Sequence, residues 1–202
     1  MRVLLVGGFS VDGKKHLVQQ LASRILASGK DSRLSIILSE IREGDLSGSI
    51  IDSDTIQVEE VRGGCPCCTM ERDLRRLLKK DAVARSDHIV LEVAGTCDLR
   101  QLEGIVRNVN ELAAARSILV LDAATLPCLS DVVPVLKTNI HASDVIVLTK
   151  GIGDDGAVLE GAMRILTGIR DDLVPHGCGE WGQDALYLTK KGTDHGFPPS
   201  HI

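Results

Sequence analysis

Aromatic residues are scarce in this chain, at 2% of its 202 residues. A core must therefore be aliphatic, built from Leu, Ile and Val. No apolar run approaches the ~20 residues that cross a bilayer as a helix, so we expect no membrane as a partner. The chain also lacks a long basic run, and its net charge is −5. We therefore expect no nucleic acid as a partner, because binding phosphates requires clustered Lys and Arg.

A leader segment and disorder are not indicated either. The first six residues are too short for a signal peptide and continue directly into two glycines. Hydrophobic residues at 44% and charged residues at 25% are ordinary values for a folded domain of this length. We expect one domain over residues 1–189, a flexible tail over residues 190–202, and a cytoplasmic location.

Apolar runs alternate with amphipathic stretches along most of the chain. The pattern predicts strands at residues 2–6, 34–38, 56–61, 88–93, 117–121, 145–148 and 185–188. It predicts helices at residues 13–28, 70–80, 99–112, 129–140 and 157–167. Strands that alternate with helices indicate an α/β fold with a mostly parallel sheet covered on both faces.

A phosphate-loop pattern lies between the first strand and the first helix. The sequence from Gly8 to Gly13 and Lys14 reads G-x-x-x-x-G-K, in the strand–loop–helix setting that this motif requires. We expect the glycines to let the backbone curl so that its N–H groups face phosphate oxygens, and Lys14 to reach the outer phosphates. The alternative is a tight strand–helix turn with surface lysines.

The metal position of this motif is altered. Lys15, followed by His16, stands where a Ser or Thr hydroxyl would bind Mg²⁺, and a charged lysine cannot ligate magnesium. Asp12 adds a negative charge that would repel phosphate unless it pairs with Lys15. Binding of Mg²⁺ and hydrolysis of the nucleotide therefore stay open at this point.

Three cysteines, Cys65, Cys67 and Cys68, lie within four residues after a glycine pair and before a predicted helix. Thiols this close in sequence cannot link distant parts of a fold through disulfide bonds with one another. In a reducing compartment they are more often metal ligands or redox groups. A helix N-terminus lowers the pKa of a thiol. The resulting thiolate suits Zn²⁺, Co²⁺, Ni²⁺ or Cu⁺. A redox pair and inert buried cysteines are the alternatives.

In this order and spacing, the two motifs resemble the CobW-like P-loop GTPases, kin of the urease and hydrogenase nickel-insertion GTPases. The likeness runs from residue 3 to about residue 155. The family's G-C-x-C-C-T motif is matched in full at residues 64–69. Its Asn-Glu after the second strand is Ser39-Glu40 here, and its E-x-x-G begins at Glu92 and ends at Gly95.

The resemblance implies a three-layer P-loop fold that binds GTP or GDP, with ATP not excluded. It places Glu92 and Gly95 near the γ-phosphate, where Glu92 holds magnesium or positions water. It makes Glu40 an extra metal ligand and places Thr149 and Lys150 beside the base. The family's guanine-binding Asp is replaced by Ile152, with nearby acids at residues 154 and 155, and its usual C-terminal domain is not in this sequence.

The function implied is a nucleotide-dependent metal chaperone or insertase for cobalt, zinc or nickel. Its client would be a metalloenzyme or a corrinoid protein, its GTPase activity weak, and its assembly a nucleotide-linked homodimer. One alternative is a non-hydrolysing metal-binding adaptor on a decayed GTPase fold, and another is a thiol-redox protein. The His-Gly-Cys sequence at residues 176–178 is interpreted as an ordinary segment, with a second metal patch as the alternative.

Overall fold

The computed structural model describes residues 2–28, 32–46, 54–61, 71–109, 114–149, 156–176 and 185–191. Its strands are β1 (Arg2–Gly8), β2 (Leu34–Leu38), β3 (Ile56–Glu60), β4 (His88–Glu92), β5 (Ala114–Asp122), β6 (Val145–Thr149), β7 (Leu173–His176) and β8 (Ala185–Lys190). Its helices are α1 (Val11–Ser28), the 3₁₀ helix η1 (Glu43–Leu46), α2 (Glu71–Leu78), α3 (Asp81–Ala84), α4 (Leu99–Arg107), α5 (Leu126–Val132), α6 (Pro134–Ala142) and α7 (Gly156–Ile169).

The described strands form one sheet in the order β3-β2-β4-β1-β5-β6-β8-β7. The strands from β3 to β6 are parallel, whereas β8 runs antiparallel to both β6 and β7. The predicted α/β class and mostly parallel sheet are therefore confirmed. In a parallel sheet the carboxyl ends of the strands meet at one edge, which is where ligands bind in such folds.

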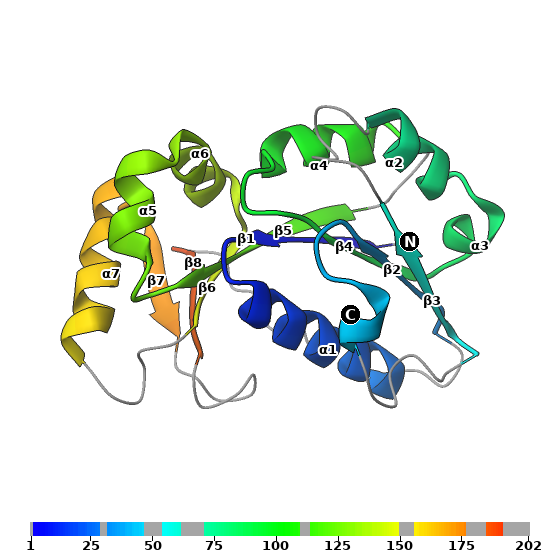
Figure 1. The fold of residues 1–202 in the computed structure, drawn as a ribbon, viewed down its shortest axis with the longest axis horizontal. Helices are drawn as coiled ribbons and strands as arrows, with labels where there is room; N and C mark the ends of the chain where they lie inside the picture. Colours follow the sequence, from blue (N-terminus) through cyan, green and yellow to red (C-terminus); the bar gives the residue numbers. More distant parts are fainter. Residues whose placement is uncertain are drawn as a thin grey trace.

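Helices cover both faces of the sheet (Figure 1). One face packs against α1 and η1 through a cluster that includes Leu17, Leu21 and Leu46. The other face packs against the helices from α2 to α7, and its core includes Leu102 and Leu166. Each cluster is almost wholly aliphatic, as the shortage of aromatic residues predicts. The sheet between its two helical layers gives a three-layer architecture.

The predicted elements differ from the structure in a few places. The helix predicted at residues 129–140 is wrong as one element, because α5 and α6 are separated at Val133. Val133 has φ −116° and ψ 93°, the extended conformation favoured before a proline such as Pro134. The strand β7 was not predicted. The helix predicted to extend to residue 112 ends at Arg107, with Asn108 as its C-cap.

Candidate functional site

The start of α1 is a capped helical turn. The helix begins at Val11, two residues before the start predicted at residue 13. The Lys14 N–H donates to the Ser10 carbonyl at 2.9 Å, and the Gly13 N–H donates to Ser10 Oγ at 3.3 Å. A serine that accepts from the third N–H of a helix is a typical N-cap.

Both glycines of the motif are nevertheless required by close packing. Gly8 has φ +141°, and a Cβ there would lie 1.9 Å from the Val120 carbonyl oxygen. A Cβ on Gly13 would lie 2.7 Å from Ser10 Oγ and 3.0 Å from a methyl carbon of Thr149. The segment between β1 and α1 is therefore pressed against β5 and β6, which fixes where the helix begins.

Lys14 is fully buried at this point, although it is the residue predicted to reach phosphates. It lies on the same side of α1 as Leu17, Val18 and Leu21, three, four and seven residues further on. Its side chain therefore enters the interior with the apolar face of the helix. A buried ammonium is costly unless it is paired, so its partners determine whether it can stay there.

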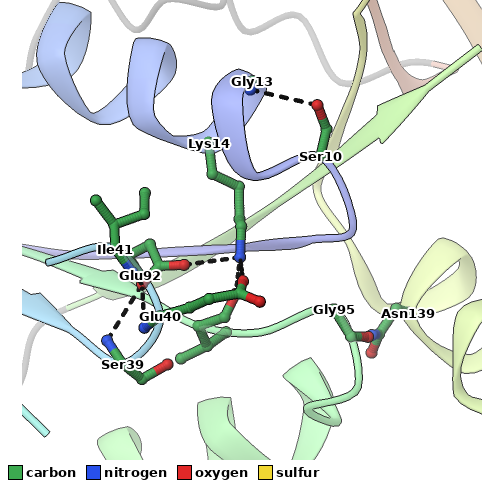
Figure 2. Close-up of polar contacts among 10 residues, drawn as sticks. Ser10, Gly13, Lys14, Ser39, Glu40, Ile41, Glu92, Gly95 and Asn139 are labelled. Atoms are coloured by element: carbon green, nitrogen blue, oxygen red, sulfur yellow. Dashed lines mark hydrogen bonds and ion pairs between the residues drawn. The ribbon is translucent and has the colours of Figure 1, made fainter. Parts of the chain in front are cut away.

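The Lys14 ammonium contacts three acceptors (Figure 2). Its Nζ lies 2.7 Å from Glu92 Oε1 and 2.9 Å from the Val93 carbonyl oxygen. The third acceptor is Glu40 Oε2, which forms a hydrogen-bonded ion pair with Nζ. Two residues predicted for different roles, Glu40 for metal and Lys14 for phosphate, are therefore in direct contact.

Glu92 is positioned by the register of the sheet. It lies opposite Val6 of β1 and Leu38 of β2, whose side chains belong to the cluster on the α1 face. Its carboxylate therefore points toward α1, and its side chain is fully buried. Oε2 accepts from three successive backbone N–H groups, those of Ser39, Glu40 and Ile41, at 3.1, 3.0 and 3.2 Å.

These contacts define what Glu92 does chemically in this structure. One of its oxygens is held by three amide donors and the other lies against Lys14. Three backbone donors on one carboxylate form an anion-binding concavity. Glu92 thus links α1 to the segment that follows β2. Its predicted catalytic role stays a prediction, and in this arrangement its carboxylate is committed to holding the two segments together.

Gly95 lies in a turn fixed from two sides. A Cβ on Gly95 would lie 2.6 Å from the ring of Phe9, so this ring packs directly on the glycine. Asn139 of α6 holds the same turn: its Nδ2 donates to the carbonyl oxygens of Cys97 at 2.9 Å and Gly95 at 3.5 Å. Its Oδ1 accepts from the Leu99 N–H at 3.0 Å. Figure 2 shows Asn139 facing Gly95.

The family model for the CobW/HypB/UreG nucleotide-binding domain matches residues 2–163. The chain belongs to this family. No curated protein sequence matches it significantly.

Solved structures of similar fold share little sequence with this CobW/HypB/UreG member. The Zn(II)-bound YjiA GTPase of E. coli is 17% identical with a TM-score of 0.57, covering 82% of this chain and 54% of its own. HypB of Archaeoglobus fulgidus is 15% identical with a TM-score of 0.56, covering 84% and 77%. FtsY of Elizabethkingia anophelis with GDP is 17% identical with a TM-score of 0.54, covering 91% and 59%.

The chain therefore spans little more than half the length of two of these three proteins. At identities this low, the structural likeness establishes a shared fold and nothing more. That fold agrees with the predicted P-loop architecture. None of the helices in the described part of the chain is long and apolar enough to cross a bilayer.

The other residues predicted for the nucleotide site are spread around the start of α1. Thr149, at the end of β6, lies with its Oγ1 3.3 Å from Ser10 Oγ, and it donates to the Leu121 carbonyl at 3.3 Å. His16 is exposed, and its ring lies against the side chain of Gln20. Lys15 is half-buried.

Asp12 is exposed in the first turn of α1. Within the described ranges no ion pair joins it to Lys15. The pairing that would neutralise Asp12 is thus not seen, and its charge remains next to the positive end of the helix, where a carboxylate is favourable.

The predicted metal ligands can be placed only in part. Cys65, Cys67 and Cys68 lie outside the described residues, as does Lys150. Glu40 is described, and its side chain is 39% exposed. The described residues alone contain no group of three or more His, Cys, Asp or Glu that could hold a metal ion. A metal site at Glu40 therefore needs ligands from beyond these residues.

A cavity adjoins Glu40 at the carboxyl ends of β2 and β3. It has a volume of about 650 Å³ and is lined by the continuous run from Leu38 to Arg42 together with Glu60 and Val61. Its lining includes the charged residues Glu40, Arg42 and Glu60. The cavity is large enough for an ion and its ligands.

Two functional positions escaped the sequence interpretation. Ser10 was not expected to cap α1, although a serine just before the first residues of a helix is a sequence signal of such a cap. Asn139 lies within a predicted helix, and only the fold brings it to the Gly95 turn, 44 residues away in sequence. No local pattern predicts a contact of this kind.

Proposed function

We propose that this CobW/HypB/UreG domain binds a nucleotide phosphate and a transition metal at adjoining sites. In this role it acts as a nucleotide-dependent chaperone or insertase for cobalt, zinc or nickel. The observation that carries the proposal is the ion pair between Lys14 and Glu40. Because one predicted phosphate ligand touches one predicted metal ligand, occupancy of either site must affect the other.

The described residues fit a phosphate group. α1 has 18 residues, and the N–H groups of Val11 and Asp12 in its first turn have no carbonyl four residues earlier in the helix to accept from them. The positive end of the helix dipole favours an anion at this place. Gly8 and Gly13 hold the backbone close to β5, and Lys14 supplies a nearby cation. The family makes GTP and GDP the first ligands to test, and ATP the comparison.

The same residues do not fit magnesium at its usual P-loop position. Lys15 offers an ammonium where a hydroxyl oxygen is needed, and an ammonium has no lone pair to donate. Ile152 stands where the family's guanine-binding carboxylate would be. We therefore propose at most weak GTPase activity and derive no hydrolytic step. Thr149 and Lys150 remain the proposed contacts for the base and sugar.

A soft or borderline metal ion suits the proposed donor set of Glu40, Cys65, Cys67 and Cys68. Thiolates with one carboxylate oxygen are ligands that Zn²⁺, Co²⁺ and Ni²⁺ accept. Val61, the last described residue before the cysteines, lines the same cavity as Glu40. Cys65 follows Val61 by four residues in the sequence, a length of chain that spans at most ~14 Å. This tether is short enough to support a site shared by Cys65 and Glu40.

The remaining parts of the proposal come from the family and from the thiol cluster. The client is a metalloenzyme or a corrinoid protein, and the nucleotide links two copies of the domain. A reducing, cytoplasmic location is proposed because clustered free thiols are typical of that compartment.

A second candidate is a metal-binding adaptor that does not hydrolyse nucleotide. The substitution at Lys15 and the early, capped start of α1 favour it, since both remove features of a working phosphate loop. The two candidates share the metal site and differ only in the nucleotide.

Calorimetric titration with GTP, GDP and ATP, each with and without Mg²⁺, separates them. Binding tighter than millimolar supports the chaperone, and tight metal binding without any such nucleotide binding supports the adaptor. Metal content of protein purified under reducing conditions tests the site itself. Cys67→Ala should lose the metal, whereas Cys128→Ala, which removes an exposed thiol outside the motif, should keep it. A reversible disulfide in metal-free protein would support a redox role instead.

A further inference from the structure

We infer that Glu40 is a gate on Lys14. Its carboxylate and an incoming phosphate compete for the same ammonium, so phosphate binding releases Glu40 into the neighbouring cavity, where it becomes available to a divalent metal ion. This inference rests on the proposed function for the identity of the two ligands. The competition itself follows from contacts among described residues.

The first step concerns the donors of Lys14. An ammonium has three N–H donors, and three acceptors surround it: Glu92 Oε1, the Val93 carbonyl oxygen and Glu40 Oε2. Nζ donates hydrogen bonds to the Val93 carbonyl and to Glu40, and it lies in an ion pair with Glu92. The side chain is fully buried among these neighbours, so a ligand cannot reach Nζ while all three stay in place. A phosphate can therefore bind Lys14 only by replacing one of these acceptors.

The second step identifies which acceptor is replaceable. Val93 contributes a main-chain oxygen, and its own N–H is bound to the Val6 carbonyl at 2.9 Å. Glu92 is fully buried and held by three backbone donors. The carboxylate of Glu40 belongs to a side chain that is 39% exposed, and Lys14 is its one recorded partner among the described residues. Glu40 is thus the acceptor that can leave.

The third step concerns charge. One ammonium between two carboxylates leaves the group with a net charge of −1. A phosphate that approaches Lys14 adds further negative charge, which repels the partly exposed carboxylate at short range. Loss of the Lys14 pair and repulsion by the phosphate act in the same direction, and both favour rotation of the Glu40 side chain away from α1.

The fourth step concerns where Glu40 goes. Its backbone N–H remains bound to Glu92 Oε2, so the main chain need not move. Its side chain already lines the cavity of about 650 Å³ at the ends of β2 and β3. A rotation of the side chain is therefore enough to present a carboxylate there. By thermodynamic linkage, a metal ion that captures Glu40 must raise the affinity for phosphate by the same factor.

The test compares Glu40→Gln with Glu43→Gln. Glutamine keeps the shape and an acceptor oxygen but has no charge to repel phosphate. Glu43 is exposed three residues away, which makes it a control for the change in net charge. In metal-free protein, Glu40→Gln should raise the affinity for pyrophosphate and GDP about fivefold, and Glu43→Gln should leave both within twofold.

The coupling is measured on the same proteins. In the wild type, saturating Zn²⁺ should raise the affinity for pyrophosphate, and pyrophosphate should raise the affinity for Zn²⁺ by an equal factor. In Glu40→Gln this mutual effect should disappear. Unchanged or weaker pyrophosphate binding by Glu40→Gln would overturn the inference, as would coupling that persists in the variant.

A third measurement separates this inference from the proposed function. The rate at which an acylating reagent modifies Lys14, followed by mass spectrometry, requires neither ligand. It should rise in Glu40→Gln and stay unchanged in Glu43→Gln. If the wild type binds neither Zn²⁺ nor nucleotide, the proposed function fails. Modification of Lys14 at an equal rate in all three proteins refutes the gate even if both ligands bind.

Discussion

The Lys14 ammonium and the Glu92 carboxylate lie 2.7 Å apart, and both side chains are fully buried. A buried ion pair adds little net stability over an apolar pair of the same shape, but loss of one partner leaves an unpaired charge in the interior. Removing one of the two residues should therefore cost much more stability than the intact pair contributes.

We therefore expect Lys14→Met and Glu92→Gln each to lower the free energy of unfolding by about 3 kcal/mol. The double variant should lose clearly less than the sum of the two losses, because it leaves no uncompensated charge. Urea unfolding at pH 7 measures all three. Simple additivity would show that the two groups are not energetically coupled.

Ser10 caps α1 through the Gly13 N–H, and Ser10→Ala should lower the free energy of unfolding by about 1 kcal/mol. The matched control is Ser23→Ala on the exposed side of the same helix, where Oγ donates to the Gln19 carbonyl. That change should stay within about 0.5 kcal/mol. Equal effects of the two substitutions would argue against the cap.

Gly95→Ala should destabilise the protein by about 1–3 kcal/mol, because the new methyl group would overlap the ring of Phe9. Adding Phe9→Leu should recover part of the loss by making room. Gly104→Ala is the control, since a Cβ in that part of α4 meets no atom within 4 Å. Alanine there should raise stability by about 0.5–1 kcal/mol, and thermal unfolding of the four proteins gives the order.

Asn139→Ala should lower the free energy of unfolding by about 2 kcal/mol, because it removes the acceptor of the buried Leu99 N–H and a donor to the Cys97 carbonyl. Asn139→Asp keeps an acceptor for the Leu99 N–H but no donor for the Cys97 carbonyl. Hydrogen exchange at the Leu99 amide should therefore accelerate more in the alanine variant than in the aspartate variant. Equal acceleration would contradict the assigned roles of the two amide atoms.

Burial lowers the pKa of His88, Arg2 lowers it further, and Asp87 acts in the opposite sense. The folded state thus binds a proton less readily than the unfolded state does. The stability that depends on neutral His88 is present above the ordinary pKa of about 6.5, and it is lost as the pH falls through that value toward the lower pKa of the folded state.

His88→Gln should consequently reduce the loss of stability between pH 7.5 and pH 5.5, relative to the wild type. Urea unfolding at the two pH values provides the comparison. A wild-type slope in His88→Gln would show that other groups carry the pH dependence.

Much of the fold could be predicted because the strands have strong apolar periodicity. β2 is found at residues 34–38 as predicted, and β1, β4, β6 and β8 lie within two residues of their expected bounds. β7 escaped because it has four residues, half of them exposed, and contains Pro175 at the edge of the sheet. Proline is tolerated at such edges but argues against a strand in the sequence alone.

The site was harder to predict than the fold. Motif matching placed Lys14, Glu40 and Glu92 in one region, but it did not predict that they bind one another. That arrangement depends on strand register, which directs Glu92 toward α1, and on the helical period, which buries Lys14. Both are properties of the assembled layers. The cysteine site stays a prediction, because its residues lie outside those described.

The reversed direction of β8 has a practical consequence. Ala185, its first residue, pairs with Thr149, and His176 at the end of β7 pairs with Tyr187. His176 and Ala185 therefore both lie at the carboxyl edge of the sheet, where β1 leads into α1. Trp181, the one tryptophan of the chain, falls between these two residues in the sequence. Its intrinsic emission can be followed, without any label, in the titrations with nucleotide and metal described above.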